Sequence, residues 1–573
     1  MEASFWDGKR APGISDTVDF SEYGSVIEVV EKSFKNYADR AAFTSIGLTM
    51  TYADIDEKSA AFASYLQNHT NLKPGDTIAI QMPNILQYPI AMYGAMRAGL
   101  IVTNTNPLYT EREMLHQFND SEAKALVCMD VFARSVQNVV ANTGIETVII
   151  TSLADMLPTP KRVLINFATK YIKKVVPSYS LPNSVDFRQA LKLGKAKPFK
   201  AVPPTAANET VILQYTGGTT GVAKGAELTN QNLVSNMLQT KQMMQQTDDK
   251  GNLVKGDKQS IVVAPLPLYH IYAFTVHLMA LCEQGEHSIL IANPRDTEMF
   301  IKMMKPWKLT TFVGLNTLFV SLLASPRFKE LDFSELKSTL SGGTALIPAT
   351  ASRWKEITGV GISEGYGLTE CAPVVSGNPG NGLERMGTVG QPVPGTSLKC
   401  IDDQGNEVAI GERGEICVRG PQVMKGYWKR PDASKDAFTE DGEWFRTGDV
   451  GIIEEDGFVS IVDRIKDMII VSGFNVFPNE IEGVVAEHPS VENCAVIGVP
   501  DEKSGEAVKL FVVTQDSNLT AEDLKAFCKE QLTAYKLPRF IEFRDELPMT
   551  PVGKILRREL KDEEEAKRAT KAA

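Results

Sequence analysis

The chain has 573 residues, of which 43% are hydrophobic and 23% are charged, and 60 basic against 71 acidic residues give a formal net charge of −11. This length predicts two or more domains, the composition is that of an ordinary globular protein, and the acidic balance argues against nucleic-acid binding. Seven scattered cysteines without a CxxC pair predict no zinc site and suit a reducing cytosol. The first residues lack a secretory-signal pattern and the apolar stretches are too short to span a membrane, so we expect a cytoplasmic protein.

The first 460 residues alternate apolar, strand-like runs with helical patterns. A strand is expected over 76–80 and a helix over 87–98, and this alternation predicts parallel sheets covered by helices. From about 385 to 463, short strands with frequent turns predict a β-rich subdomain. We therefore expect an α/β fold in which a large N-terminal domain of βα-layered sheets, together with this subdomain, occupies residues 1–463.

Residues 464–573 predict a small, mobile α+β C-terminal domain that is long enough to be a folding unit. The patterns indicate helix 479–487, strand 494–499, strand 508–513, helix 520–532 and strand 540–543. Thr520 with Asp523 is typical of a capping box, which supports the second helix. The charged, alanine-rich tail over 562–573 is expected to fray.

A basic segment interrupts the acidic average over 156–200, where ten basic residues accompany one acid, Asp186. Apolar residues recur within it at roughly helical spacing: Val163, Leu164, Phe167, Tyr171 and Ile172. A basic amphipathic segment can lie on an anionic bilayer, but a solvated surface insertion would have the same composition. Residues 161–174 are therefore a hypothesis for peripheral contact with the inner, cytoplasmic membrane.

The glycine-rich segment over 215–225, Tyr-Thr-Gly-Gly-Thr-Thr-Gly-Val-Ala-Lys-Gly, is the strongest local indication of chemistry. It follows an apolar run over 210–215 that predicts a buried strand, and helical spacing resumes over 228–238 with Thr229 or Asn230 as N-cap. A strand, a glycine-rich turn and a helix form a common phosphate site, and the order Ala-Lys-Gly excludes a Walker A loop. We predict a phosphate-binding loop made by Thr216, Gly217, Gly218, Thr219, Thr220, Gly221 and Lys224.

Further short motifs carry groups that a nucleotide site would use. In the Glu-Gly-Tyr-Gly-Leu-Thr-Glu run over 364–370, a carboxylate such as Glu370 could hold Mg²⁺ and Tyr366 could stack on a base. Asp449 ends a Trp-Phe-Arg-Thr-Gly-Asp run and could accept ribose hydroxyls. The charged run over 463–467 could equally be a solvated linker, and Lys554 follows a proline- and glycine-shaped loop, where it could neutralise a carboxylate attacking a phosphate.

In this order and spacing the motifs resemble the adenylate-forming superfamily of AMP-binding enzymes across nearly the whole chain. The resemblance is strongest over 215–225, 365–370, 447–449, 463–467 and 553–554. Within the superfamily the chain is most similar to bacterial long-chain-fatty-acid–CoA ligases, because of the sequences over 265–270, 341–343, 369–375 and 471–480. Two departures from the family signature are the insertion of Glu443 before Trp444 and Ile465 at the position of an expected second lysine.

The resemblance implies that a fatty carboxylate attacks the α-phosphate of MgATP and that coenzyme A then displaces AMP from the acyl-adenylate. It implies that residues 216–224 bind the β- and γ-phosphates, Glu370 the metal, and Asp449 with Arg464 the ribose. The implied catalytic residues are Lys554, Glu370 and Thr216. The other implied cofactor-binding residues are Gly343, Gly365, Tyr366 and Thr369 near the nucleotide and Gly473 near coenzyme A, and Lys466 is the implied hinge of the C-terminal domain.

Other functions are weighed against this one. The acyl pocket is expected around 310–319, Tyr269 and His270, although these apolar residues could be plain core and His270 is expected to be structural. The alternatives are a ligase for medium-chain or aromatic acids, an enzyme that passes acyl-adenylate to a carrier protein, and a non-catalytic lipid-binding protein. The uninterrupted run over 463–478 argues against an enzyme that passes acyl-adenylate to a carrier protein. The intact Glu370 and Lys554 argue against a non-catalytic lipid-binding protein. The sequence does not decide whether the protein forms an oligomer.

Overall fold

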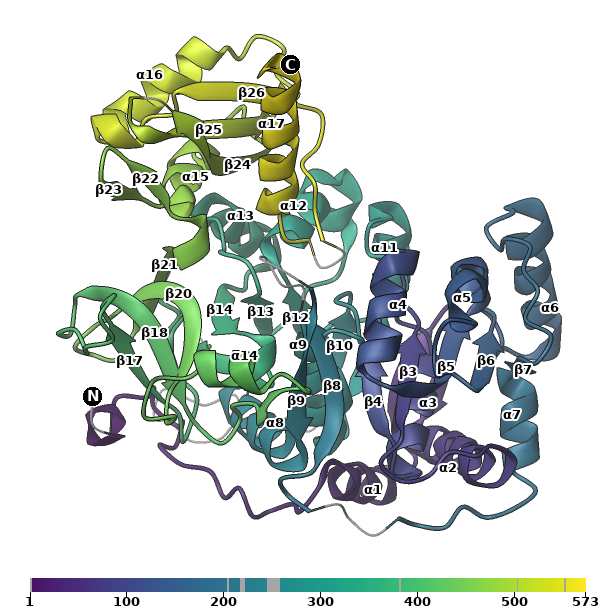
Figure 1. The fold of residues 1–573 in the computed structure, drawn as a ribbon. Coiled ribbons are helices and arrows are strands. Elements are labelled where there is room, and N and C mark those ends of the chain that lie inside the picture. Colours follow the sequence, from purple (N-terminus) through teal and green to yellow (C-terminus); the bar gives the residue numbers. More distant parts are fainter. Residues whose placement is uncertain are drawn as a thin grey trace.

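Two large sheets and their covering helices form the bulk of the molecule (Figure 1). The computed structural model describes residues 3–202, 206–216, 222–244, 258–380, 383–501, 503–550 and 553–572. The central strands of both sheets pair in parallel, and antiparallel pairs lie toward their edges. These observations confirm the predicted βα-layered α/β fold.

The first large sheet has the order β16-β15-β14-β13-β12-β10-β11-β1-β2 and the second β19-β9-β8-β4-β3-β5-β6-β7. The strands of the first are β1 (Ala41–Ser45), β2 (Leu48–Thr51), β10 (Ile261–Ala264), β11 (His287–Leu290), β12 (Thr311–Gly314), β13 (Ser338–Gly342), β14 (Ile362–Gly367), β15 (Val374–Gly377) and β16 (Gln391–Pro392). The strands of the second are β3 (Thr77–Gln81), β4 (Ile101–Asn104), β5 (Ala123–Met129), β6 (Thr147–Thr151), β7 (Val185–Asp186), β8 (Thr210–Thr216), β9 (Lys224–Thr229) and β19 (Gly426–Tyr427).

Helices cover both sheets, and the predicted strand and helix over 76–98 are confirmed as β3 and α3. All residues of β3 and α3 are buried, as expected for elements enclosed by parallel-sheet layers. The helices of this part are α1 (Val26–Asn36), α2 (Tyr52–His69), α3 (Gln87–Arg97), α4 (Glu111–Asp120), α5 (Ala133–Val140), α6 (Thr159–Phe167), α7 (Phe187–Gly194), α8 (Asn230–Met244), α9 (Ile271–Ala273), α10 (Leu281–Glu283), α11 (Thr297–Met304), α12 (Asn316–Ala324), α13 (Pro348–Thr358) and α14 (Pro431–Asp436). Two π-helical segments, η3 (Ala168–Ile172) and η4 (Phe274–Ala280), continue α6 and α9.

Two smaller sheets complete the fold. One is antiparallel and contains β17 (Ser397–Ile401), β18 (Arg413–Arg419), β20 (Phe445–Ile453) and β21 (Val459–Arg464). The other belongs to a C-terminal unit that has its own core clusters and stands apart from the large sheets, drawn light green to yellow in Figure 1. The C-terminal unit contains β22 (Ile469–Val471), β23 (Phe474–Val476), α15 (Pro478–Ala486), β24 (Asn493–Asp501), β25 (Gly505–Val513), α16 (Ala521–Gln531), β26 (Phe540–Arg544) and α17 (Arg557–Ala572). The order of elements predicted for this unit and the capping box at Thr520 are confirmed.

Two local predictions are wrong. The glycine-rich segment does not lead from a strand into a helix, because β9 pairs antiparallel with β8 before α8 begins; Thr229 then caps α8, with its hydroxyl 3.2 Å from the Asn232 backbone nitrogen. The tail, expected to fray over 562–573, is helical as far as the structure describes it, because α17 continues to Ala572. It is held by the ion pair between Glu564 and Lys509, 2.8 Å apart, and by buried Leu560.

The basic segment lies away from the C-terminal unit. In Figure 1, α6 stands at the right-hand edge of the molecule, beside β6 and β7. None of the helices in the described part of the chain combines the length and apolar character needed to cross a bilayer.

Candidate active site

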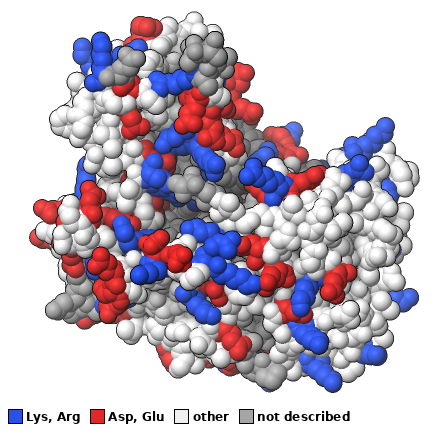
Figure 2. Space-filling view, in the orientation of Figure 1, with Lys and Arg blue, Asp and Glu red and all other residues white. Residues whose placement is uncertain are grey.

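A cleft of about 2730 Å³ lies between the large sheets and the C-terminal unit, and Figure 2 shows it as a hollow with basic side chains along its rim. Most predicted site residues line it: Thr216, Lys224, Gly343, Gly365, Tyr366, Thr369, Glu370, Asp449, Arg464, Lys466 and Lys554. Gly473 does not line the cleft and lies in the turn between β22 and β23. The predicted loop residues Gly217, Gly218, Thr219, Thr220 and Gly221 lie outside the described residues.

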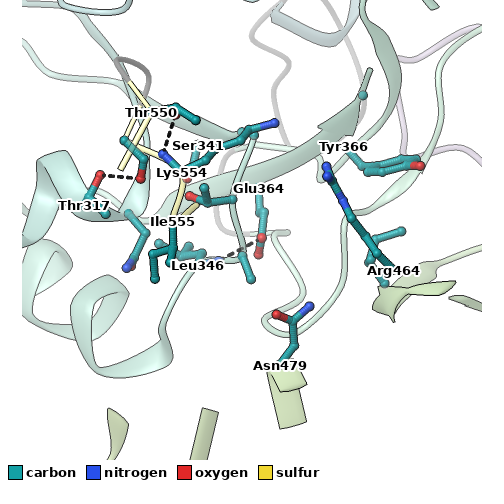
Figure 3. A pocket seen from close by; sticks show the side chains of 18 of the residues that line it. Thr317, Ser341, Leu346, Glu364, Tyr366, Arg464, Asn479, Thr550, Lys554 and Ile555 are labelled. Atoms are coloured by element: carbon teal, nitrogen blue, oxygen red, sulfur yellow. Dashed lines mark hydrogen bonds between the residues drawn. The ribbon is translucent and has the colours of Figure 1, made fainter. Parts of the chain in front are cut away.

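Asp449 connects two of these residues. The Tyr366 hydroxyl donates to Oδ2 of Asp449 at 2.6 Å, and Nε of Arg464 lies 3.4 Å from Oδ1. Asp449 and Arg464 are cross-strand partners in the antiparallel pair β20–β21, which sets their approach. Burial raises the pKa of Tyr366 well above its ordinary value, and the Asp449 charge adds to this, so the tyrosine is a neutral donor. Figure 3 shows Tyr366 and Arg464 side by side on one wall of the cleft.

Lys554 belongs to the C-terminal unit and lines the cleft opposite Tyr366 and Arg464. Its backbone N–H donates to the Thr550 hydroxyl at 3.0 Å, and the Thr317 hydroxyl of α12 donates to the Gly553 carbonyl at 3.4 Å (Figure 3). Gly553 has φ +75°, and a Cβ there would lie 2.5 Å from the Thr317 hydroxyl oxygen, so only glycine fits this docked turn. The loop therefore presents Lys554 against the large part of the chain.

Cations converge on the cleft. Burial lowers the pKa of Lys554 to about 8, with a further contribution from Arg464, while Asp449 and Glu370 oppose the shift. Burial and Arg464 likewise lower the pKa of Lys466 to about 8. Cations that depress one another's pKa in a buried space favour an anionic ligand between them.

Glu370 faces a partner that the sequence did not indicate. The Tyr427 hydroxyl donates to Oε1 of Glu370 at 2.8 Å, and the ammonium of Lys224 lies 4.4 Å from the centroid of the Tyr427 ring. Tyr427 reaches this position because β19 pairs with β9, and no motif in the sequence marks that pairing. Thr216 and Lys224 are cross-strand partners at the loop end of the β8–β9 hairpin, so the predicted phosphate residues that are described flank the base of the loop.

Three polar groups near Gly343 are also available to a ligand. The buried hydroxyls of Ser341 and Thr344 have no hydrogen-bond partner among the described residues. Burial raises the pKa of Glu364 to about 7, and one of its carboxyl oxygens accepts the Leu346 backbone N–H at 3.0 Å. All three side chains line the cleft. Buried polar groups without protein partners favour a polar ligand here.

The acyl-pocket and histidine predictions concern β12, the first turns of α12 and the two residues before α9. His270, Tyr269 and Thr317 line the cleft. Burial lowers the pKa of His270 to about 3, with a contribution from Lys554, and its Nδ1 accepts the Tyr272 backbone N–H at 3.3 Å. A neutral histidine that caps α9 agrees with the expected structural role.

Known proteins and family models match nearly the whole chain. Residues 30–428 match the model of the AMP-binding enzyme family, and residues 480–554 match the model of the AMP-binding enzyme C-terminal domain. The chain is 48% identical to a long-chain-fatty-acid–CoA ligase of Escherichia coli O157:H7 over 99% of both chains, and 36% identical to one of Bacillus subtilis over 94% of both. Among solved structures, ATP-bound MatB from Rhodopseudomonas palustris is 28% identical, with a TM-score of 0.79 over 94% of this chain and 98% of the other.

Proposed function

This chain belongs to the family of AMP-binding enzymes, and from that membership we infer that it is an AMP-forming long-chain-fatty-acid–CoA ligase. Its substrates are a long-chain fatty acid, ATP and coenzyme A, and its products are acyl-CoA, AMP and pyrophosphate. The observation that carries this function is the meeting of Lys554 with Asp449, Arg464 and Tyr366 in one cleft, in a chain that is 48% identical to such ligases over almost its whole length.

The nucleotide is proposed to lie between the two walls of the cleft. Its ribose hydroxyls would bind Asp449 and Arg464, and its adenine would lie at Tyr366 and Gly365, with Gly343 and Thr369 nearby. The β- and γ-phosphates would bind Thr216, Lys224 and the loop 217–221. The buried hydroxyls of Ser341 and Thr344 and the convergent cations support a polar, anionic ligand in this cleft.

The first step joins the fatty carboxylate to the α-phosphate. A carboxylate oxygen forms the new bond to phosphorus while the bond to the bridging oxygen breaks, and pyrophosphate leaves with its electron pair. Both reactants are anions, so we propose that the Lys554 ammonium bridges them and stabilises the charge of the transition state. In the second step the thiolate of coenzyme A attacks the acyl carbon, and AMP leaves.

The proposed site for a divalent cation is Glu370, whose carboxylate lines the cleft. Among the described residues no group of three or more His, Cys, Asp or Glu could hold a metal ion. Mg²⁺ needs no such group, because it is commonly bound through one or two carboxylates together with substrate phosphates. Glu370 supplies such a carboxylate, and the Tyr427 hydroxyl orients it. We propose that Glu370 would hold Mg²⁺, which would neutralise phosphate charge.

We propose that residues 464–573 turn about Lys466 between the two steps. Lys554 occupies the cleft here, whereas Gly473 lies outside it, so this arrangement suits the first step. The turn would withdraw Lys554 and bring the Gly473 loop to coenzyme A. Such domain rearrangement allows one site to perform two reactions in order.

We also propose a peripheral contact with the cytoplasmic membrane through residues 161–174. Neither α6 nor η3 has a buried residue, and five of their large apolar side chains are 52–69% exposed: Val163, Leu164, Phe167, Tyr171 and Ile172. The cations among them, Lys161, Arg162, Lys170, Lys173 and Lys174, make no ion pair with a described residue. An apolar surface flanked by unpaired cations suits an anionic bilayer, where a fatty acid also concentrates.

Exchange of pyrophosphate into ATP tests the ligase. With fatty acids of graded chain length, we expect exchange that is strongest with long chains, followed by release of AMP when coenzyme A is added. A maximum with aromatic or medium-chain acids would contradict the substrate class, and the absence of exchange with every acid would contradict the enzyme.

A further inference from the structure

The small domain is tied to the large one at a second place besides the Lys554 loop. Asp463 lies on the large-domain side of the proposed hinge, next to Arg464 in β21, and is fully buried. One of its carboxylate oxygens accepts the Arg464 backbone N–H at 2.7 Å, and the other accepts the Asn479 backbone N–H at 2.8 Å. The second bond crosses the hinge, because Asn479 is the second residue of α15.

Asp463 takes the place of a helix cap for α15. The first N–H groups of a helix have no partner within the helix, and the residue preceding α15, Phe477, makes no side-chain cap. A carboxylate at this end also interacts favourably with the helix dipole. The cap of a small-domain helix is therefore supplied by a residue of the large domain.

The side chains of Asn479 and Arg557 connect the Asp463 contact to the segment that carries Lys554. The Asn479 amide donates to the Val462 carbonyl at 3.4 Å, across the hinge, and its oxygen accepts from the Arg557 guanidinium at 2.7 Å. Arg557 follows Lys554 by three residues and forms a 2.7 Å ion pair with Glu482 of α15. Figure 3 shows Asn479 among the side chains that line the cleft, below Arg464 in this view.

We propose that Asp463 is a positioning residue that holds the small domain in the orientation in which Lys554 reaches the nucleotide. Its bond to the N-terminus of α15 must break when the domain turns, so it stabilises the adenylating arrangement and contributes nothing to the second step. Asn479 and Arg557 transmit this restraint to the Lys554 loop. The inference rests on the proposed ligase and on its two half-reactions.

The test is Asp463→Asn, which keeps the size of the side chain but replaces one acceptor by a donor that faces an N–H group. We expect pyrophosphate exchange to fall about tenfold, as for the loss of a hydrogen bond to a charged group. Formation of acyl-CoA from a preformed long-chain acyl-adenylate should proceed at the parent rate or faster. A parent enzyme without exchange would contradict the ligase itself, whereas a normal parent and an unaffected Asp463→Asn variant would overturn only the positioning role.

Asp523→Asn is the matched control, because Asp523 belongs to the capping box of α16 within the small domain and does not cross the hinge. It should leave both half-reactions unchanged; losses equal to those of Asp463→Asn would overturn the inference. Asn479→Ala retains the backbone bond to Asp463 and should cause a smaller loss confined to exchange. Equal loss of both half-reactions in a variant with the parent's thermal unfolding midpoint would assign Asp463 a merely structural role.

Discussion

A Cβ atom placed on Gly343 would lie 3.6 Å from Cε of Lys554, although the two residues belong to opposite sides of the cleft. Gly343 has φ +89°, a conformation that favours glycine, and it follows β13 in the large sheet. The backbone of Gly343, at the end of β13 in the large domain, is therefore in contact with the Lys554 side chain of the small domain. This contact places the first reaction step at the interface between the two parts.

Replacement of Lys554 should separate the two half-reactions. Lys554→Ala removes the ammonium that would bridge carboxylate and α-phosphate, so we expect pyrophosphate exchange to fall by about 10²–10³-fold. Thioester formation from preformed acyl-adenylate should change little, because the proposed turn of the small domain withdraws Lys554 before that step. Equal losses in both assays would contradict the proposed role.

The first half-reaction should weaken at alkaline pH. The pKa of Lys554 lies near 8 instead of 10.5, so the ammonium is mainly present below pH 8 and is lost above it. Single-turnover adenylation should therefore decline as pH rises through about 8. Lys554→Arg keeps its charge throughout this range and should show no such decline, even if its rate is lower. A parent profile that stays flat to pH 9.5 would contradict the assignment.

Asp449 should determine recognition of the ribose. Asp449→Asn keeps the shape but removes the charge between Tyr366 and Arg464, and we expect KM for ATP to rise about tenfold, as for the loss of a hydrogen bond to a charged group. The preference for ATP over 2′-deoxyATP should shrink in the same variant. Asp456→Asn, at an exposed ion pair with Arg385, is the matched control and should leave both quantities unchanged.

The surface of α6 and η3 should bind anionic vesicles. We expect the parent to sediment with vesicles that contain phosphatidylglycerol, and to do so less with purely zwitterionic ones. The combined substitutions Leu164→Ser, Phe167→Ser and Ile172→Ser should abolish sedimentation, because each large side chain contributes about 1.5–3 kcal/mol when it is buried. Met299→Ser, which alters an exposed apolar residue of α11, should bind as the parent does. Undiminished binding of the triple variant would reject this surface.

The sequence predicted the fold, and most of the predicted site residues line one cleft, because both depend on local patterns. The buried parallel strand β3 has an apolar centre, Ile78 to Ile80, and Asp449 and Arg464 belong to runs that resemble the family. The short β9 strand was missed because charged residues such as Lys224 and Glu227 interrupt its apolar pattern, and a hairpin around a glycine-rich loop resembles a strand-to-helix turn.

Contacts between distant segments could not be predicted in this way. Tyr427 reaches Glu370 only because β19 pairs with β9, and the Asn479 N–H reaches Asp463 only because α15 packs against β21. The tail was expected to fray because its sequence is charged and rich in alanine, whereas ion pairs and the buried Leu560 hold α17 in the structure. A single sequence does not reveal which distant charges will pair.

The central claim is that this chain couples AMP formation from ATP to thioester formation with a long-chain acid. The most direct measurement is the stoichiometry of products when the purified protein is given ATP, Mg²⁺, coenzyme A and a long-chain fatty acid. We predict one acyl-CoA, one AMP and one pyrophosphate for each ATP consumed. Release of ADP and phosphate, or acyl-adenylate that accumulates without any acyl-CoA, would contradict it.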